Sequence, residues 1–291
     1  RFTANPTSIV ANDATTATLK VELFDTFGNK VDPASQDSVE IIFKDGSTEL
    51  GQLEQLGRGV DGSFTARVKS QKSGIDTFDF KLNGNAANYP DVTVAYTAGA
   101  ANARMSEISA QPVSITADGV TKSTVTVQLK DQFGNNLTEG IGASAVTIAH
   151  VGERTADEYV NVAKDNGDGT YSITITSKKV GDDTFGFMVL AASGGANNRA
   201  TVTYTAGEAS AAQSEISVSP AVITADGTTE AIVTVTLKDA LGNRLNSNGN
   251  NAQVLLDQVN TGVIKEELVY EGADSGRLSL IHISEPTRPE P

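Results

Sequence analysis

Few side chains in this chain have the types and the spacing that catalysis requires. There is no cysteine, and the two histidines are His150 and His282. His150 follows the apolar stretch from Val146 to Ala149, which indicates a residue on the face of a strand, and no Gly-x-Ser-x-Gly nucleophile pattern accompanies it. Acidic residues are plentiful, but nothing singles out the pair of carboxylates that glycoside hydrolysis needs. The sequence therefore predicts no catalytic residue and no enzyme activity.

Few residues have the types and spacing that binding of a metal or a cofactor requires. Asp182 with Asp183, and Asp165 with Asp168, supply the oxygen ligands that Ca²⁺ prefers, but they do not follow the spacing of a calcium loop. Aspartate-rich turns are common between strands, so we assign no metal ligand here and keep calcium between domains as the alternative. The glycine-rich segment 192–196 lacks the lysine and the helix of a phosphate-binding loop. We therefore expect no cofactor.

The charge balance limits the possible partners. The chain carries 22 Lys and Arg against 36 Asp and Glu, a net charge of −14. Nucleic-acid binding depends on basic residues that neutralise phosphates, so this balance argues against it and equally against anionic membrane surfaces. No apolar run approaches the roughly 20 residues of a transmembrane helix, so we expect membrane anchoring only through parts outside this chain.

One sequence segment occurs three times in the chain. Pro112 to Leu137 and Pro220 to Leu245 are identical at 16 of 26 aligned positions, and Pro6 to Val31 is a more diverged copy. The repeat period is 106 residues from Asp25 to Asp131 and 108 residues from Asp131 to Asp239. A period near 100 is too long for a solenoid and suits whole domains in tandem.

Each copy contains an alternating strand that ends in the same turn. Val125, Val127 and Leu129 alternate with polar residues, which predicts a strand with one face toward a core. Aspartate can bind its own downstream backbone, and glycine and asparagine tolerate positive φ, so the motif Asp-x-Phe/Leu-Gly-Asn predicts a tight turn. We expect its apolar residue to pack beneath the turn as a plug. The predicted structural turn and core residues are Asp25, Phe27, Gly28, Asn29, Asp131, Phe133, Gly134, Asn135, Asp239, Leu241, Gly242 and Asn243.

The remainder of each unit also repeats. Asp61-Gly62-Ser63-Phe64 corresponds to Asp168-Gly169-Thr170-Tyr171, and Tyr96 to Gly99 corresponds to Tyr204 to Gly207. Short strands with turn signals every 8–15 residues and no helical period predict antiparallel β-sandwiches of immunoglobulin-like architecture. The links after Gly99 and Gly207 are short, so we expect an extended rod in which each domain adds roughly 30–40 Å.

These boundaries divide the chain into three domains and a tail. We place domain 1 at 1–99, domain 2 at 100–207 and domain 3 at 208–277, the last one incomplete because it lacks its final strands. Residues 278–288 read LSLIHISEPTR, which resembles the translation of an adapter used in sequencing libraries. We therefore interpret 278–291 as a non-native tail and expect residues 209–277 to be unstable.

The repeated motifs resemble the group 1 bacterial immunoglobulin-like domains of the invasin and intimin adhesin family. The resemblance is carried by Ile-Thr-Ala-Asp-Gly at 115–119 and 223–227, the Val-x-Val-x-Leu-Lys-Asp strand, the Phe/Leu-Gly-Asn turn and the closing Tyr-Thr-Ala-Gly. It covers residues 6–276. The first copy departs from the pattern, with Ala11-Asn12-Asp13 in place of Ala-Asp-Gly.

The resemblance implies a non-enzymatic stalk on the bacterial cell surface. In such proteins tandem domains act as spacers, held by an outer-membrane anchor, that project a receptor-binding tip; both the anchor and the tip would lie outside this chain. We expect a monomeric rod whose host or surface receptor is bound through an absent domain. Two alternatives stay open: a module whose loops bind a host or surface ligand directly, and an accessory module of a secreted enzyme.

Overall fold

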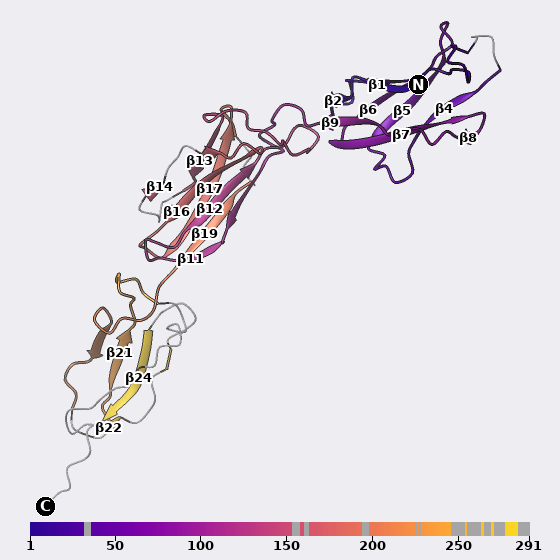
Figure 1. Cartoon of the computed structure of the whole chain (residues 1–291). Coiled ribbons are helices and arrows are strands. Elements are labelled where there is room, and N and C mark those ends of the chain that lie inside the picture. Colours follow the sequence, from indigo (N-terminus) through magenta and orange to yellow (C-terminus); the bar gives the residue numbers. More distant parts are fainter. Residues whose placement is uncertain are drawn as a thin grey trace, which may run out of the picture.

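The computed structural model describes residues 1–31, 36–152, 158–159, 163–193, 198–224, 226, 228–245, 254, 263–264, 269–270 and 277–284. The regular structure in these ranges is β-strand, arranged in three domains that follow one another end to end along the chain (Figure 1). The same ranges contain no helix that is long and apolar enough to span a membrane. The all-β tandem architecture predicted from the sequence is confirmed.

Domain 1 is a sandwich of two sheets. The sheet orders are β1-β3-β6-β5 and β2-β9-β7-β4, with β8 paired to β7. The strands β2 and β9 run parallel, whereas the other pairs are antiparallel. The strands are β1 (Phe2–Asn5), β2 (Ser8–Val10), β3 (Ala17–Val21), β4 (Val39–Phe43), β5 (Gly51–Arg58), β6 (Phe64–Ser70), β7 (Gly74–Leu82), β8 (Asn85–Ala86) and β9 (Val92–Thr97).

Domain 2 repeats this topology, except that two short strands, β14 and β15, pair with β16 where domain 1 has the single strand β5 beside β6. Its sheet orders are β10-β12-β16-β14, with β15 on β16, and β11-β19-β17-β13, with β18 on β17; β11 and β19 are again the parallel pair. The strands are β10 (Glu107–Gln111), β11 (Ser114–Thr116), β12 (Ser123–Gln128), β13 (Val146–His150), β14 (Glu158–Tyr159), β15 (Lys164–Asp165), β16 (Thr170–Thr176), β17 (Gly181–Val189), β18 (Ala192–Ser193) and β19 (Ala200–Thr205).

The alternation read from the sequence accounts for the cores. Along β3 the side chains of Ala17, Leu19 and Val21 are fully buried, while Thr18 between them is exposed. Val125 and Val127 on β12 are buried in the same way. Because successive side chains of a strand point to opposite faces, each strand gives one row to the core, and each large aliphatic side chain buried there stabilises the fold by about 1.5–3 kcal/mol.

Each of the first two domains has a core of its own. The core of domain 1 gathers buried side chains from β1 to β9, and the core of domain 2 gathers those from β10 to β19. Both cores contain a pair of buried phenylalanines two residues apart on one strand, Phe78 and Phe80 on β7 and Phe185 and Phe187 on β17. Two complete sandwiches with separate cores can fold independently.

The hairpin before β16 shows why its glycines are needed. Gly167 and Gly169 both have positive φ, +82° and +81°. A Cβ added at Gly169 would lie 2.0 Å from the carbonyl oxygen of Leu137, whereas nothing lies within 4 Å of a Cβ added at Gly167. Gly169 is therefore fixed by close backbone contact as well as by its conformation.

Domain 3 is described in part. Its sheet has the order β20-β21-β24-β22, with β23 on β24, built from β20 (Glu215–Ser219), β21 (Ala231–Thr236), β22 (Val263–Ile264), β23 (Val269–Tyr270) and β24 (Arg277–Ser284). In this sheet β24 lies beside β21 as β16 lies beside β12 in domain 2. Residues 278–284 thus pair as a strand, because their sequence alternates; their interpretation as a foreign tail stays a prediction.

Candidate functional site

The motif Asp-x-Phe/Leu-Gly-Asn forms the same closed turn in all three domains. In the second copy the Asp131 Oδ1 accepts the N–H of Phe133 at 2.9 Å and that of Asn135 at 3.0 Å. The first and third copies repeat both bonds from Asp25 and Asp239. Gly28, Gly134 and Gly242 each have a φ of +84°, the conformation that the sequence predicted for the glycine.

The apolar residue of the motif is not a plug beneath the turn. Phe27 is 88% exposed, Leu241 is 52% exposed and Phe133 is 37% exposed. The plug prediction is therefore wrong. The aspartate closes the turn from within, so the side chain two positions later is directed outward.

The second copy of the turn also holds domain 2 to domain 1. The Asp131 Oδ2 accepts the N–H of Gly99, the residue that ends domain 1, at 2.9 Å. The side-chain amide of Asn135 reaches the loop between β6 and β7: its Oδ1 accepts the N–H of Ser73 at 2.8 Å and its Nδ2 donates to the Gln71 carbonyl at 2.8 Å. Three hydrogen bonds thus cross this first joint.

The third copy makes the same three bonds to the end of domain 2. The Gly207 N–H donates to the Asp239 Oδ2 at 3.1 Å. The Asn243 Oδ1 accepts the N–H of Val180 at 3.3 Å, and the Asn243 Nδ2 donates to the Lys178 carbonyl at 3.0 Å. The joint is therefore a repeated device, with bonds somewhat longer at the second occurrence than at the first.

In each joint the asparagine and the aspartate support one another. The Nδ2 of Asn135 also donates to the Asp131 Oδ2 at 2.8 Å, and the Nδ2 of Asn243 donates to the Asp239 Oδ2 at 2.9 Å. One carboxylate oxygen closes the turn and the other binds both the asparagine and the previous domain. A carboxylate that accepts several N–H groups is a strong, directional anchor, because bonds to a charged acceptor exceed neutral ones.

The links between domains are fastened to the domain that follows them. In the first link the Asn102 N–H donates to the Lys130 carbonyl at 2.7 Å, and the hydroxyl of Ser106 donates to the Asn102 carbonyl at 2.8 Å. Ser210 and Ser214 repeat these two bonds in the second link. The links are thus short and held in place, as the sequence predicted.

The electrostatics of the joint aspartates favour the charged form. Burial by itself would raise the pKa of the Asp131 carboxyl, but its hydrogen bonds, first that from the Asn135 side chain and then that from the Gly99 N–H, outweigh burial and lower this pKa below its ordinary value. The pKa of Asp239 is lowered by the same balance. Both aspartates are almost fully buried, at 1% and 3% exposure.

A cavity of about 330 Å³ lies at the first joint. It is lined by residues 10–12 of domain 1, by the link residues 99–102, and by Asp131, Gln132 and Phe133 of the turn. Its walls include the apolar side chains of Val10 and Phe133 and the engaged Asp131 carboxylate, and they contain no Ser, Thr, Cys, Lys or His nucleophile.

His150, the one histidine that the sequence raised as a candidate catalyst, is a buried side chain of β13. Its Nε2 lies 3.0 Å from the Asp183 Oδ1, and its ring meets Phe185 edge to face with centroids 5.8 Å apart. The Tyr204 hydroxyl donates to the other oxygen of Asp183 at 3.1 Å. These contacts are typical of buried polar side chains that hydrogen-bond to one another in a core. In domain 1 the equivalent position on β4 is Phe43, which pairs with Phe78 as His150 pairs with Phe185.

The acidic pairs considered for calcium hold protein groups instead. The Asp165 carboxylate accepts the N–H of Gly167 at 2.9 Å and the Tyr171 hydroxyl at 2.9 Å. Asp168 accepts the N–H of Thr170 at 3.0 Å. Within the described ranges no group of three His, Cys, Asp or Glu side chains is placed to hold a metal ion.

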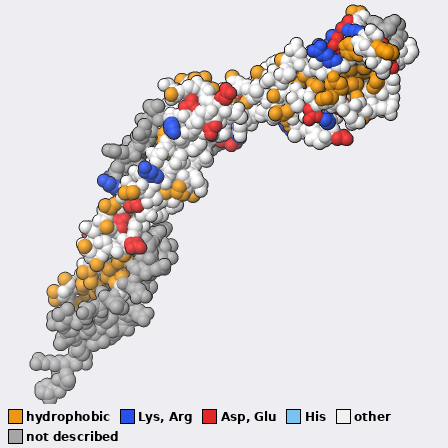
Figure 2. Space-filling model, viewed as in Figure 1, with side chains coloured by type: hydrophobic (Ala, Val, Ile, Leu, Met, Phe, Trp, Pro, Cys, Tyr) orange, Lys and Arg blue, Asp and Glu red, His pale blue; other side chains and the backbone are white. Residues whose placement is uncertain are grey.

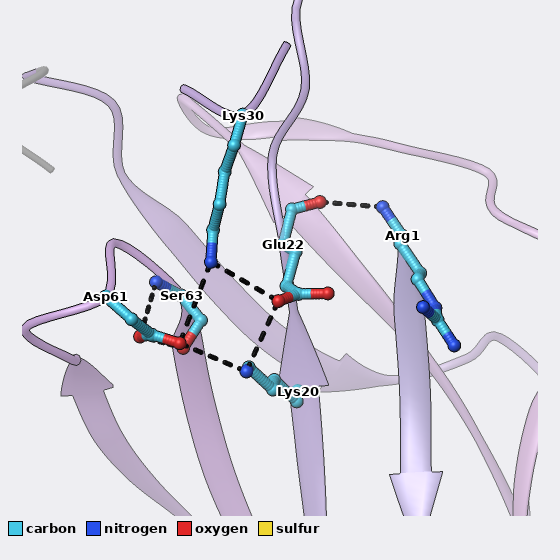
Figure 3. Close-up of polar contacts among 6 residues, drawn as sticks. All are labelled: Arg1, Lys20, Glu22, Lys30, Asp61 and Ser63. Atoms are coloured by element: carbon cyan, nitrogen blue, oxygen red, sulfur yellow. Dashed lines mark hydrogen bonds and ion pairs between the residues drawn. The ribbon is translucent and has the colours of Figure 1, made fainter. Parts of the chain in front are cut away.

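A cluster of four charges lies on the surface of domain 1 (Figure 3). Lys20 lies 3.3 Å from Glu22 and 3.1 Å from Asp61, and Lys30 lies 3.4 Å and 3.7 Å from the same carboxylates. Two cations and two anions cancel, so the cluster has no net charge with which to attract an ion. Exposed pairs of this kind contribute little to stability, because water and salt screen them.

The described surface in view is mixed in charge. Figure 2 shows Lys and Arg side chains interspersed with Asp and Glu along the rod, without a broad basic area on this face. This agrees with the acidic composition and gives no support for a nucleic-acid surface on the face shown.

The sequence located the turn residues but not their role across the joint. The sequence motif predicted these residues only as turn residues within one domain. The structure places them at the boundary with the previous domain: Asp131, Asn135, Asp239 and Asn243. A signal was available, because Gly99 precedes Asp131 and Gly207 precedes Asp239 by the same 32 residues. This equal spacing is compatible with a shared joint, but it follows from the repeat period and does not by itself specify the contacts.

Comparison with known proteins places this architecture among bacterial adhesins. Residues 1–99, 102–207 and 210–279 match the family model described as invasin, domain 3. The Escherichia coli adhesin FdeC superposes with a TM-score of 0.58 at 22% identity, over 98% of this chain and 88% of that one. Yersinia pseudotuberculosis InvD gives 0.54 at 20% identity, over 100% and 84%. Invasin, a bacterial integrin-binding protein, gives 0.51 at 21% identity, over 98% and 54%. These identities show a shared fold.

Proposed function

Because the chain belongs to the invasin domain 3 family of bacterial immunoglobulin-like adhesin domains, we propose that it is a non-enzymatic stalk segment of a cell-surface adhesin. The observation that carries this proposal is the repeated joint. Both boundaries between consecutive domains are held by an aspartate and an asparagine that bind the backbone of the previous domain.

Such a joint suits a mechanical role. A rod transmits position only if its joints resist bending, and three hydrogen bonds at each boundary, together with a link fastened to the next domain, restrict rotation between the domains. The described side chains that could do chemistry, His150 and Asp183 among them, are instead engaged in the core. The chain would act by holding its neighbours at a set distance.

Membership of the family supports a proposal for location and partners. We propose that the segment lies outside the cell, anchored to the bacterial outer membrane, and that a receptor on a host or another surface is bound by a domain other than these. FdeC is an adhesin and invasin binds integrins; the stalk proposal assigns to this chain the part of such a protein that carries the tip rather than the tip itself.

Solution scattering and adhesion together test the proposal on residues 1–207, whose two domains have complete cores. The maximum dimension should exceed that of residues 1–99 by roughly 30–40 Å, the length of one domain built from strands of this size. Latex particles coated with residues 1–207 should adhere to cultured epithelial cells no better than albumin-coated particles. A compact two-domain particle would refute the stalk, and adhesion that soluble residues 1–207 compete away would favour direct binding instead.

A further inference from the structure

We propose that the first turn of domain 1 is a docking surface for the C-terminal end of another domain of this same repeat. The surface, called here the first-turn surface, consists of Asp25, Phe27 and Asn29. It lies on domain 1 at the position that holds the previous domain in domains 2 and 3. This inference goes beyond the stalk role, since the surface would accept such a domain whatever the rod does.

The first-turn surface is already in the conformation of the two working joints. The Asp25 Oδ1 accepts the N–H groups of Phe27 at 2.9 Å and of Asn29 at 2.8 Å, and the Asn29 Nδ2 donates to the Asp25 Oδ2 at 3.0 Å. The equivalent bonds in the second and third copies differ from these by at most 0.2 Å. Formation of the joint would therefore cost little rearrangement of the turn.

What distinguishes the first copy is the set of groups left open. Asp131 and Asp239 are buried and their asparagines half-buried, whereas Asp25 and Asn29 are exposed. Among the described residues the Asp25 Oδ2 accepts no N–H from another domain, and the Asn29 Oδ1 accepts no hydrogen bond. In the part of the chain that the structure describes, the Asp25 Oδ2 thus keeps room for a second donor beside the Asn29 Nδ2, and the Asn29 Oδ1 and the second Nδ2 hydrogen are open to a partner.

The exposed aromatic side chain supports the same reading. Phe27 is 88% exposed, while Phe133, its equivalent at the first joint, is 37% exposed and lines the cavity beside the link. Covering a large apolar side chain that is exposed to water is favourable, because its apolar surface is removed from water. The joint geometry would cover Phe27 as it partly covers Phe133.

The two existing joints identify the occupant. At the first joint the hydrogen bonds from the previous domain come from its backbone: the N–H of Gly99, the N–H of Ser73 and the carbonyl of Gln71. At the second joint the groups are again backbone, from Gly207, Val180 and Lys178. The hydrogen bonds of the turn therefore depend on the backbone of a domain end and not on its polar side chains, and two different ends already fit it.

A rearranged chain tests this directly. Residues 100–214 are placed ahead of residues 1–99 in one polypeptide, so that domain 2 precedes domain 1. The seven residues 208–214 then stand between Gly207 and Arg1, and Gly207 lies 32 residues before Asp25, the spacing found at both natural joints. Residual dipolar couplings measured on this chain report whether its two domains share one orientation.

Two substitutions make the test specific to the first-turn surface. We expect one shared alignment tensor in the rearranged chain, and two separate tensors after Asn29→Ala. Phe27→Ser changes an exposed side chain and should leave the fold of domain 1 intact. We expect this substitution in the rearranged chain to give two separate alignment tensors as well. The matched control is Asn29→Ala in residues 1–207, where this turn lies outside the joint and the shared tensor should persist.

Independent tensors in the unsubstituted rearranged chain would overturn the proposal, as would a shared tensor that Asn29→Ala leaves unchanged. Sedimentation of residues 1–207 provides a second arm. Head-to-tail association that Asn29→Ala abolishes would support the proposal, with the end of domain 2 from a second copy as the occupant. Neither arm depends on the adhesive or stalk role, so failure of the docking surface can be told apart from failure of the proposed function.

Discussion

Asn135→Ala should uncouple the first two domains at a cost that can be worked from the structure. The substitution removes two hydrogen bonds that cross the joint, from the Ser73 N–H and to the Gln71 carbonyl, both 2.8 Å long. It also removes one bond within domain 2, to the Asp131 carboxylate at 2.8 Å. At about 1 kcal/mol net for each neutral bond, the coupling between the domains should fall by about 2 kcal/mol.

Urea unfolding followed by NMR, which reports each domain separately, measures this coupling. The free energy of unfolding is compared between residues 1–207 and the single domains 1–99 and 100–207. In residues 1–207 the joint is lost when the less stable domain unfolds. The joint bonds therefore add to the free energy of unfolding of that domain, and Asn135→Ala should lower it. The loss of unfolding free energy caused by Asn135→Ala should be about 2 kcal/mol larger in residues 1–207 than in residues 100–207 alone.

The first copy of the turn provides the matched control. Asn29 makes the same bond to its own aspartate, at 3.0 Å, and no bond to another domain among the described residues. Asn29→Ala should therefore cost the same in 1–207 as in 1–99. If Asn135→Ala also costs the same in the single domain and in the pair, the joint bonds contribute nothing net and the reasoning fails.

Three further outcomes are expected. The hydrogen bonds that lower the pKa of Asp131 outweigh its burial, so its contribution to the joint is complete above the ordinary aspartate pKa of about 3.9 and is lost as the pH falls through the lowered pKa. Domain alignment in 1–207 should therefore persist at about pH 5 and weaken only below that ordinary value, and an alignment indifferent to acid would contradict this. Gly169→Ala should destabilise domain 2 in urea by about 2–4 kcal/mol through strain and backbone collision, while Gly167→Ala should cost about 1–2 kcal/mol through its positive φ alone; equal losses would count against the close contact. Limited proteolysis of the whole chain should remove residues 209–277 first and leave 1–207, and a third domain as resistant as the others would contradict the predicted instability.

Local physics explains why so much of the fold could be read directly. Strict alternation in segments such as 123–129 places one row of side chains inside, and nearby aspartate and glycine close the turn, so strands, turns and the sandwich class follow from neighbours in sequence. The tandem repeat then extends the result from one domain to the next. The register of the strands follows from the same rule, since a slip of one residue would turn the apolar row outward.

The prediction failed where an outcome depended on contacts between distant parts of the chain. Phe27 and Leu241 were expected beneath the turn, but the aspartate already fills the turn with its own hydrogen bonds and leaves them outside. β24 was not expected, because the alternation of residues 278–284 suits any open strand edge that the fold presents.

The sequence by itself thus determined the strands, the turns, the repeat and the family of this protein. The tertiary structure alone decided what the second carboxylate oxygen of Asp131 and the amide of Asn135 would bind. Their partners lie 32 and 64 residues earlier, and they meet only when the link folds onto the next domain. Hydrogen bonds across a boundary depend on the relative placement of two finished domains, and no pattern within either one specifies that placement.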